Sequence, residues 1–376
     1  MENHTYNISQ SRVALLLQNP YQGGIERVLI NLARGLRAQG ILVDLLIRSS
    51  DTPFFNQLEP EVNVIQLAPA EKSDVRSALI GYCEQMRPAI LLTGKEEDGA
   101  MAVSIKSALE VPPCISLGVH LNYTAQLNSR RAGVIRKFRR YRQIRKLYRG
   151  ADTLICVSEG VCDDISRILK KTPVETLVLP NPVITPELGE LAAQGVDHPW
   201  LRDPGGVPVL LGVGRMGKIK NFPLLIKAFA RVRSHRDCRL IILGDGRQRR
   251  KLVALAQRLG VADDVDFPGF VDNPYAYMSR SALFVLSSEW EGLPTVLIEA
   301  LAVGTPVVST DCPSGPYEIL QGGRFGKLVP TGDEAALADA IIATLSRQHD
   351  PQQLRDAVKS YTMEASCKAY IQKLGL

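Results

Sequence analysis

Residues 207–223 read V-P-V-L-L-G-V-G-R-M-G-K-I-K-N-F-P, an apolar run followed by a loop rich in glycine and in cations. The run Val207–Val213 has the length and composition of a buried strand, and Pro223–Val232 has the apolar spacing of a helix. A strand, a glycine loop and a helix in this order form one half of a parallel β-α-β unit. The stretch therefore predicts a doubly wound α/β domain that begins at residue 207.

The same alternation of apolar runs and helix-length segments extends in both directions along the chain. Further strands are expected at 239–243, 265–268, 283–287, 306–310 and 326–329, and on the N-terminal side at 13–17, 42–47, 89–93, 113–118, 153–157 and 176–179. A stretch rich in proline and glycine separates the two series. We expect two parallel-sheet domains at 1–183 and 207–352, a linker at 184–206 and a helical segment at 353–376. Ligands of such sheets bind at the carboxyl ends of the strands.

The composition is that of an ordinary globular protein. The chain has 376 residues, 45% of them hydrophobic, and a formal net charge of +6. No segment approaches the roughly 18 unbroken apolar residues that suggest a membrane-spanning helix. The seven cysteines are scattered and none forms a C-x-x-C pair, which argues against a disulfide framework or a zinc site. These features exclude a disordered, fibrous or membrane-embedded chain and indicate a cytoplasmic protein.

One segment accounts for the net positive charge of the chain, since the other residues together have a net charge of −4. Residues 129–149 hold ten Lys and Arg side chains and no acid, and Val134, Phe138, Tyr141 and Tyr148 recur at helical spacing within them. Three interpretations stay open: a surface helix whose apolar stripe packs on its own domain, a surface for anionic lipid or the diphosphate of an acceptor, and a nucleic-acid site. No nucleic-acid module accompanies the segment, so we expect no nucleic-acid partner. The cations assigned to a membrane or acceptor surface are Arg136, Lys137, Arg139, Arg140, Arg142, Arg145 and Lys146.

A glycine pair lies between the first expected strand and the helix that follows it. Gly23 and Gly24 let backbone amides approach a ligand, and the start of the helix adds a positive dipole end. Together these features are typical of an anion site, most often for phosphate. The alternative is an ordinary turn that uses glycine for its backbone freedom.

The glycine loop of the second domain resembles a dinucleotide-binding motif. Residues 212–217 match G-x-G-x-x-G after a strand, so an NAD-dependent oxidoreductase must be considered. The acid that should hold a ribose about 20 residues further on is poorly placed, because Asp245 lies 28 positions after Gly217. The cations of the loop, Arg215, Lys218 and Lys220, suit a free diphosphate leaving group better than a dinucleotide cradled by backbone alone. The alternative is that these cations are solvated at the surface.

Residues 287–300, S-S-E-W-E-G-L-P-T-V-L-I-E-A, are the most informative segment for chemistry. They begin at the end of an expected strand, and Gly292 and Pro294 set a turn and the start of a helix. Glu291 then lies in the loop and Glu299 within the helix. Amides and carboxylates at such a helix start could bind a ligand that carries both phosphate and hydroxyl groups. The alternative is a helix-terminal acid and a buried structural acid.

The pattern of Arg215 followed five residues later by Lys220, with Glu291 and Glu299 spaced as E-x7-E, resembles retaining glycosyltransferase family 4. Supporting runs are L-I-I-L-G-D-G at 240–246, D-V-D-F-P-G-F-V at 264–271, A-L-A-V-G-T-P-V-V-S-T at 300–310 and G-K-L-V-P-T-G-D at 326–333. In the N-terminal half the resemblance is looser. It rests there on Q-G-G-I-E-R at 22–27, on His120 and on A-D-T-L-I-C-V-S at 151–158.

The resemblance implies a GT-B fold, in which two Rossmann-like domains face a cleft and a C-terminal helix crosses back to the N-terminal domain. It implies chemistry without metal or cofactor, with Arg215 and Lys220 neutralising the departing diphosphate. Glu299 is then expected at the ribose and Glu291 and His120 at the sugar. The other substrate-binding positions that it implies are Gly23, Gly24, Gly244, Phe270, Val271, Gly292, Leu293, Thr295 and Val296. The D-x-D triplet at 264–266 is interpreted as a turn acid and an exposed strand acid rather than a metal site.

The resemblance also implies the reaction class. We expect retaining transfer of a hexose or N-acetylhexosamine from a nucleotide sugar, with UDP favoured, to a glycan acceptor of cell-surface polysaccharide or lipopolysaccharide synthesis. The basic segment favours an acceptor linked to polyprenyl diphosphate or to lipid A core, and a peripheral position on the inner face of the cell membrane. A soluble small-molecule glycosyltransferase or a nucleotide-sugar epimerase of the same fold stays open. So do the NAD-dependent oxidoreductase and a non-catalytic membrane scaffold.

Overall fold

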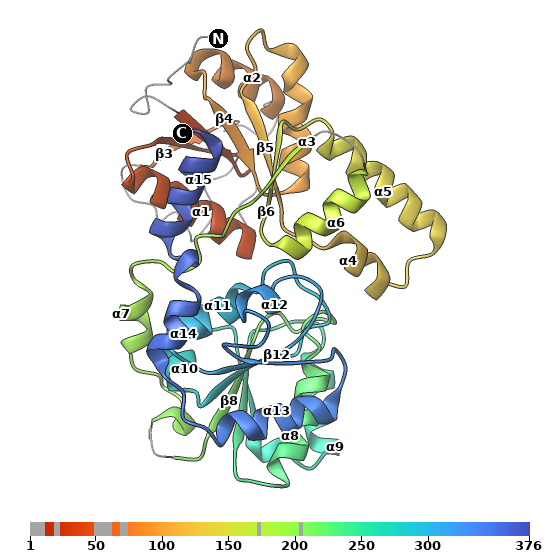
Figure 1. Cartoon of the computed structure of the whole chain (residues 1–376), viewed down its shortest axis with the longest axis vertical. Coiled ribbons are helices and arrows are strands. Elements are labelled where there is room, and N and C mark those ends of the chain that lie inside the picture. Colours follow the sequence, from red (N-terminus) through yellow and green to blue (C-terminus); the bar gives the residue numbers. More distant parts are fainter. Residues whose placement is uncertain (1–11, 19–22, 49–61, 68–73, 171–173, 203–205) are drawn as a thin grey trace. The chain divides into compact units, whose positions relative to one another are not determined.

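The computed structural model describes residues 12–18, 23–48, 62–67, 74–170, 174–202 and 206–376 (Figure 1). The chain forms two compact units. Unit 1 comprises residues 1–183 and 361–376, and unit 2 comprises residues 184–360. Residues 353–360, grouped above with the returning helix, thus lie in unit 2.

Unit 1 is built on one sheet of seven parallel strands with the order β3-β2-β1-β4-β5-β6-β7. The strands are β1 (Arg12–Leu16), β2 (Leu42–Ile47), β3 (Asn63–Gln66), β4 (Ile90–Thr93), β5 (Cys114–Val119), β6 (Thr153–Cys156) and β7 (Glu175–Val178). The helices are α1 (Gly24–Ala38), α2 (Val75–Met86), α3 (Glu96–Ile105), α4 (Tyr123–Ser129), α5 (Val134–Tyr148), α6 (Glu159–Leu169) and α15 (Met363–Leu374), with a 3-10 turn at Lys106–Ala108. Another 3-10 turn, Lys359–Tyr361, contains the boundary between the two units. The strand order reverses at β1, so the loops after β1 and β4 flank the usual ligand position of such a sheet.

The C-terminal helix α15 completes the core of unit 1 by packing on α1. The contact is close: a Cβ atom built on Gly35 of α1 would lie 2.4 Å from Sγ of Cys367 and 2.7 Å from Cγ of Met363. The Ser366 hydroxyl donates a hydrogen bond to the Pro180 carbonyl. Met363, Cys367 and the nearby Tyr370 are buried in one apolar cluster with β1, β2 and α1.

Unit 2 repeats the architecture with six parallel strands in the order β10-β9-β8-β11-β12-β13. The strands are β8 (Val209–Val213), β9 (Arg239–Leu243), β10 (Val265–Gly269), β11 (Leu283–Leu286), β12 (Val307–Thr310) and β13 (Lys327–Val329). The helices are α7 (Leu188–Ala193), α8 (Phe222–Arg233), α9 (Arg249–Arg258), α10 (Pro274–Arg280), α11 (Thr295–Ala302), α12 (Pro316–Ile319), α13 (Glu334–Leu345) and α14 (Pro351–Ala357), with 3-10 turns at Pro199–Leu201 and Ala262–Asp264. Here the strand order reverses at β8, which pairs with both β9 and β11.

The expectation of two parallel α/β sheets is confirmed, because each buried strand follows from a short apolar run. The edge strand β3 was not predicted: three of its four residues are exposed, and an exposed edge strand carries little apolar signal. None of the helices in the described ranges is long and apolar enough to cross a bilayer.

Candidate active site

The loops after β8 and β9 pack backbone against backbone in unit 2. Gly244 has φ +112°, and a Cβ atom built on it would lie 2.2 Å from the Gly214 carbonyl oxygen. The Gly214 amide, at φ +150°, donates to the Leu243 carbonyl at 3.0 Å. Both positions therefore need glycine, for conformation and for space. This packing fixes the loop that carries Arg215, whose side chain is exposed and makes no ion pair with any residue of the described ranges.

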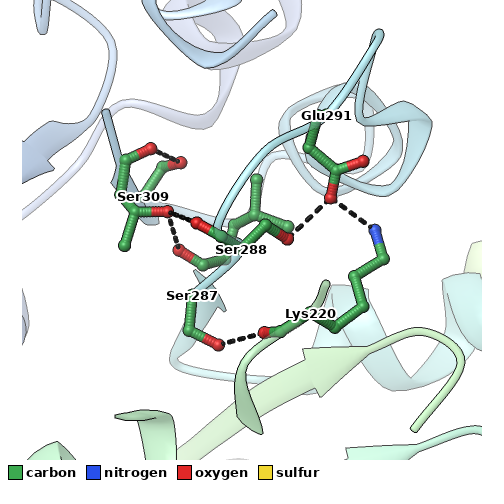
Figure 2. A network of polar contacts seen from close by, with 7 residues as sticks. Lys220, Ser287, Ser288, Glu291 and Ser309 are labelled. Carbon is green, nitrogen blue, oxygen red and sulfur yellow. Dashed lines mark hydrogen bonds and ion pairs between the residues drawn. The ribbon is translucent and has the colours of Figure 1, made fainter. Parts of the chain in front are cut away.

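Lys220 and Glu291 meet at the point where the strand order of unit 2 reverses. Lys220 follows β8, Glu291 follows β11, and these two strands are paired. The Lys220 Nζ donates to Oε1 of Glu291 at 2.8 Å, and the side chains are only 20% and 12% exposed (Figure 2). The Ser288 hydroxyl donates to the same oxygen at 2.6 Å. One carboxylate oxygen thus accepts from a cation and from a hydroxyl.

Hydroxyl groups also fix the backbone beneath this pair. The Ser287 hydroxyl donates to the Lys220 carbonyl at 2.7 Å (Figure 2). The Thr310 hydroxyl, at the end of β12, donates to the Ser288 carbonyl at 2.7 Å. The backbone amide of Glu291 donates to the Pro313 carbonyl at 3.1 Å. Three neighbouring strands therefore hold the two charged groups in place. Neither serine was predicted as a site residue, and nor was Thr310, since nothing in their spacing marks them.

The remaining candidate residues after β11 lie in the loop and first turns of α11. Glu299 is buried at 3% exposure and has an interaction partner within the protein. Pro294 precedes the helix, and no side chain caps its first turn. The other members of this group are Gly292, which is buried, and Leu293, Thr295 and Val296, which are partly exposed.

Phe270 and Val271 directly follow β10. The Phe270 ring is 68% exposed, an unusual state for a large apolar side chain at the carboxyl end of a strand. The neighbouring Gly269 carbonyl accepts a hydrogen bond from the Gly244 amide at 2.7 Å. Gly244 and Phe270 thus belong to adjoining loops at one edge of the sheet of unit 2.

The two acids of the D-x-D triplet have separate protein partners. Asp264 accepts from Nε of Arg233 at 2.7 Å, and Asp266 lies 2.9 Å from Nε2 of His198. Across the part of the chain that the structure describes, no three His, Cys, Asp or Glu side chains could jointly hold a metal ion. The triplet is a structural element of unit 2.

In unit 1, Gly23 precedes the first residue of α1, Gly24. Gly23 is extended, and a Cβ atom built on it would lie 2.4 Å from a carboxylate oxygen of Glu26. Glu26 is itself buried and paired with Nζ of Lys95 at 2.7 Å. Gly23 therefore makes room for a buried ion pair that the sequence analysis did not predict. The preceding loop residues 19–22 lie outside the described residues.

His120 stands at the end of β5 with its ring over two glycines. Cβ atoms built on Gly118 and Gly94 would lie 2.7 Å and 3.3 Å from its Nε2. Burial lowers the pKa of His120 to about 4, so the ring is neutral at pH 7. It makes no hydrogen bond with a residue that the structure describes, which leaves its ring nitrogens able to contact a hydroxyl group.

A second buried acid of unit 1, Asp98, was also missed. It lies in the first turn of α3, and its Oδ1 accepts from Nε2 of Gln18 at 3.0 Å. Its other oxygen has no hydrogen-bond partner among the described residues. Burial raises the pKa of Asp98 to about 6. Glu96 and Glu97 precede it in the same turn, so nothing in the sequence distinguishes Asp98 from its neighbours.

The cations of α5 fall into two sets. Three have partners in unit 1: Nη2 of Arg140 donates to both oxygens of Glu96 at 2.5 and 2.8 Å, Nε of Arg145 donates to the Ile168 carbonyl, and Nζ of Lys137 donates to Asn128. The others are exposed and make no ion pair with a residue in the described ranges. They are Arg136, Arg139, Arg142 and Lys146.

The expected apolar stripe of this helix is divided. Tyr148 is buried, as is Ile144, but Val134 and Phe138 are 84% and 62% exposed. The interpretation in which the stripe packs on its own domain is therefore wrong for the first half of α5. Helical spacing shows which residues share a face, but it does not show where a covering element ends.

Comparison with known families agrees with this architecture. Residues 197–361 match the family model of glycosyl transferases group 1, and residues 22–187 match the model of glycosyltransferase family 4. The two matches lie in different halves of the chain. They replace the dinucleotide-binding oxidoreductase as the explanation of the glycines at 212–217.

Several known proteins are similar in sequence. An N-acetylgalactosamine-N,N'-diacetylbacillosaminyl-diphospho-undecaprenol 4-alpha-N-acetylgalactosaminyltransferase of Campylobacter jejuni is 34% identical over 57% of this chain and 55% of its own length. The lipopolysaccharide core biosynthesis glycosyltransferase LpsE of Rhizobium meliloti is 32% identical over 60% of this chain and 65% of its own. The chain thus spans less than two thirds of the length of these relatives. LpsD of the same organism is 26% identical over 90% of this chain and 88% of its own.

Solved structures share the fold. The lipopolysaccharide outer core galactosyltransferase WaaB superposes with a TM-score of 0.73 at 18% identity, over 97% of this chain and 99% of that one. Anabaena HepE in complex with UDP-glucose gives a TM-score of 0.74 at 18% identity, over 97% and 98%. Together with the two family matches, these similarities show that the chain belongs to glycosyltransferase family 4 and has the GT-B fold.

Proposed function

We propose that this protein transfers a hexose or N-acetylhexosamine from a nucleotide sugar, with UDP favoured, to a glycan acceptor, with retention of the anomeric configuration. The observation that carries the proposal is the half-buried Lys220–Glu291 pair at the switch point of the unit 2 sheet, with the exposed Arg215 in the same loop as Lys220. Family membership and relatives that make lipopolysaccharide core and diphospho-undecaprenol-linked glycans support it.

In this proposal Arg215 and Lys220 stabilise the charge that develops on the departing diphosphate. Arg215 offers a planar fork for two phosphate oxygens, and Lys220 a point charge held in position by Glu291. Cations that the protein already holds in place, as Glu291 holds Lys220, cost little reorganisation when the negative charge forms. They take the part that a divalent metal plays in other phosphate chemistry, so the reaction needs no metal or other cofactor.

The remaining residues would orient the donor. Glu291 accepts hydrogen bonds from sugar hydroxyls, Glu299 accepts from the ribose, and the exposed Phe270 ring lies against the base. In unit 1, the neutral His120 contacts the sugar. The other positions proposed to contact the donor are Gly23, Gly24, Gly244, Val271, Gly292, Leu293, Thr295 and Val296.

No side chain need act as a nucleophile. The bond between the anomeric carbon and the diphosphate oxygen breaks, and the acceptor oxygen forms its bond on the same face. The acceptor proton passes to the oxygen of the leaving phosphate. Glu291 is poorly suited to a covalent role, because one of its oxygens already accepts from Lys220 and Ser288.

We further propose that the acceptor is linked to a lipid, either polyprenyl diphosphate or lipid A core. The support is α5, where exposed Val134 and Phe138 lie among unpaired cations. Each Lys or Arg near an anionic membrane contributes about 1 kcal/mol, and apolar side chains add to the attachment. The protein would then lie on the inner face of the cell membrane.

The first test is binding and turnover in the presence of a metal chelator. Thermal stabilisation by UDP-sugars, compared with GDP-sugars, ADP-sugars and NAD, identifies the donor base. Arg215→Ala and Lys220→Ala should each lower the transfer rate by about 10² or more. The matched control is Lys218→Ala, an exposed cation of the same loop, which should leave the rate unchanged. Stabilisation by NAD alone, or near wild-type turnover of both variants, would overturn the proposal.

A further inference from the structure

The helices α4 and α5 of unit 1 line an open hollow of about 770 Å³. We call it the α4–α5 hollow. Ten residues line it: Gln126, Leu127, Arg130, Gly133, Val134, Ile135, Arg136, Arg139, Arg140 and Gln143. Four of these are arginines and none is acidic, so the lining is positively charged.

The turn between the two helices fixes the shape of this hollow. Arg131 takes the left-handed conformation at φ +48°, and its amide donates to the Asn128 carbonyl at 2.8 Å. The Ala132 amide donates to the Leu127 carbonyl at 3.0 Å. These two bonds form a Schellman motif, which ends α4 and sets the direction in which α5 begins.

One of the four arginines is already neutralised and holds α5 in place. Arg140 bonds both oxygens of Glu96, and its guanidinium lies 5.4 Å from the centre of the Tyr123 ring. The Tyr123 hydroxyl donates to Glu96 at 3.0 Å and lies 2.6 Å from the hydroxyl of the buried Tyr148. Arg140 is therefore a structural member of the lining.

The other three arginines have charge to offer. Arg130, Arg136 and Arg139 are exposed and make no ion pair with a residue in the described ranges. Guanidinium groups bind phosphate oxygens in pairs, so three of them match a group with several anionic oxygens. Val134 and Ile135, 84% and 75% exposed, place an apolar surface in the same lining. The hollow thus combines sites for phosphate oxygens with a surface for a hydrocarbon chain.

We propose that the α4–α5 hollow binds the diphosphate of a lipid-linked acceptor, with the arginines on the phosphate oxygens and the first part of the lipid chain against Val134 and Ile135. This inference rests on the proposed function and makes it specific: α5 recognises one diphosphate group in addition to the general charge of the membrane. Phospholipid head groups share the phosphate chemistry but carry fewer anionic oxygens per molecule.

The experiment compares two double variants that remove equal charge from the same region. Arg130→Gln/Arg139→Gln changes the hollow, whereas Arg142→Gln/Lys146→Gln changes exposed cations of α5 outside its lining. Each is added to phosphatidylcholine vesicles that carry either a few mole per cent of polyprenyl diphosphate or enough phosphatidylglycerol to give the same surface charge. Bound protein is measured by co-sedimentation.

We expect the hollow variant to bind diphosphate vesicles at least tenfold more weakly than wild type, and the outer variant to bind them less than threefold more weakly. On phosphatidylglycerol vesicles the two variants should lose affinity equally. The hollow is not a diphosphate site if the two variants lose affinity equally on diphosphate vesicles as well as on phosphatidylglycerol vesicles. The same conclusion follows if wild type binds the two kinds of vesicle with equal affinity.

A third measurement separates this inference from the proposed function. Both variants should keep the wild-type thermal stabilisation by UDP, since the residues proposed to hold UDP's diphosphate lie elsewhere in the chain. A diphosphate preference without any binding of nucleotide sugar would leave the hollow intact and remove the transferase proposal. Binding of the donor without a preference for diphosphate vesicles would leave the transferase proposal intact and remove the hollow as a diphosphate site.

Discussion

Lys220 and Glu291 are held by hydroxyl groups as well as by their own attraction. Ser288 donates to the carboxylate, and Ser287 fixes the backbone of Lys220. A charged pair in a partly buried position loses much of its mutual stabilisation to desolvation, so its geometry depends on such hydrogen bonds. The hydroxyls therefore act as positioning groups for the two charges.

Ser288→Ala should lower kcat/KM about tenfold, mainly through kcat. The variant removes one hydrogen bond to a charged group, which contributes about 1.5–3 kcal/mol in folded proteins, and lets the Glu291 carboxylate turn away from Lys220. Steady-state kinetics with the donor and acceptor measure the effect. Glu289→Gln, an exposed acid one residue away, is the matched control. Wild-type kcat in Ser288→Ala would show that Lys220 alone orients the carboxylate.

Spacing along the chain predicted which charged residues to consider, but it did not predict their contacts. Lys220 and Glu291 meet because β8 and β11 are neighbours, and they are neighbours only because the strand order reverses at β8. A pattern of five or seven residues carries no information about that pairing. The roles given to Arg215 and Glu299 stay predictions, to be tested by substitution.

The start of α3 is linked to the end of β1 through one buried carboxyl group. Asp98 of α3 accepts a hydrogen bond from the side chain of Gln18, which lies just after β1. Its second oxygen has no partner in the described ranges, and burial raises its pKa to about 6. The charged form of Asp98 is therefore a cost to the folded state above that pH.

Asp98→Asn should stabilise unit 1 relative to wild type, and by more at pH 8 than at pH 4. The pKa of Asp98 is raised above its ordinary value of about 3.9, so the stability that its protonated form contributes is complete below about pH 4. That contribution falls as the pH rises through about 6. The difference in Tm between the variant and wild type should therefore grow from pH 4 to about pH 7 and then stay constant. A difference that is the same at every pH would assign the normal pKa to Asp98.

Elements with continuous apolar runs were predictable, and elements with mixed surroundings were not. The buried strands β1, β4 and β8 follow from composition, since both faces of a parallel sheet are covered. The edge strand β3 gave no such signal, and the stripe of α5 was only half covered. Whether an apolar face is covered depends on elements distant in the sequence.

The chain leaves unit 1 after Val183 and returns to it at Tyr361. The two segments are held together inside unit 1, because the Val183 amide donates to the Tyr361 carbonyl at 3.0 Å. Asn31 of α1 also donates to the Pro182 carbonyl at 2.8 Å. The core of unit 1 is therefore closed by the last sixteen residues of the chain, through the contact of α15 with Gly35.

Gly35→Ala should destabilise unit 1 by about 1–3 kcal/mol, the typical cost of an added group in a filled core. The new methyl group would meet Cys367 and Met363 of α15 at 2.4 Å and 2.7 Å, which outweighs the roughly 1 kcal/mol that alanine gains over glycine in a helix. Gly81→Ala is the matched control: Gly81 lies in α2 with no atom within 4 Å of a Cβ built on it, so this variant should be stabilised.

The two tryptophans allow the units to be followed separately in one denaturant titration. Trp200 and Trp290 both lie in unit 2, so their fluorescence reports the unfolding of that unit, while far-ultraviolet circular dichroism reports both. The fluorescence midpoint should be the same in wild type and both variants, and the dichroism should gain an earlier phase only in Gly35→Ala. An unchanged dichroism curve would mean that α15 moves to accommodate the new methyl group without any loss of stability in unit 1. A shift of both signals together would mean that the return of the chain makes the two units unfold as one.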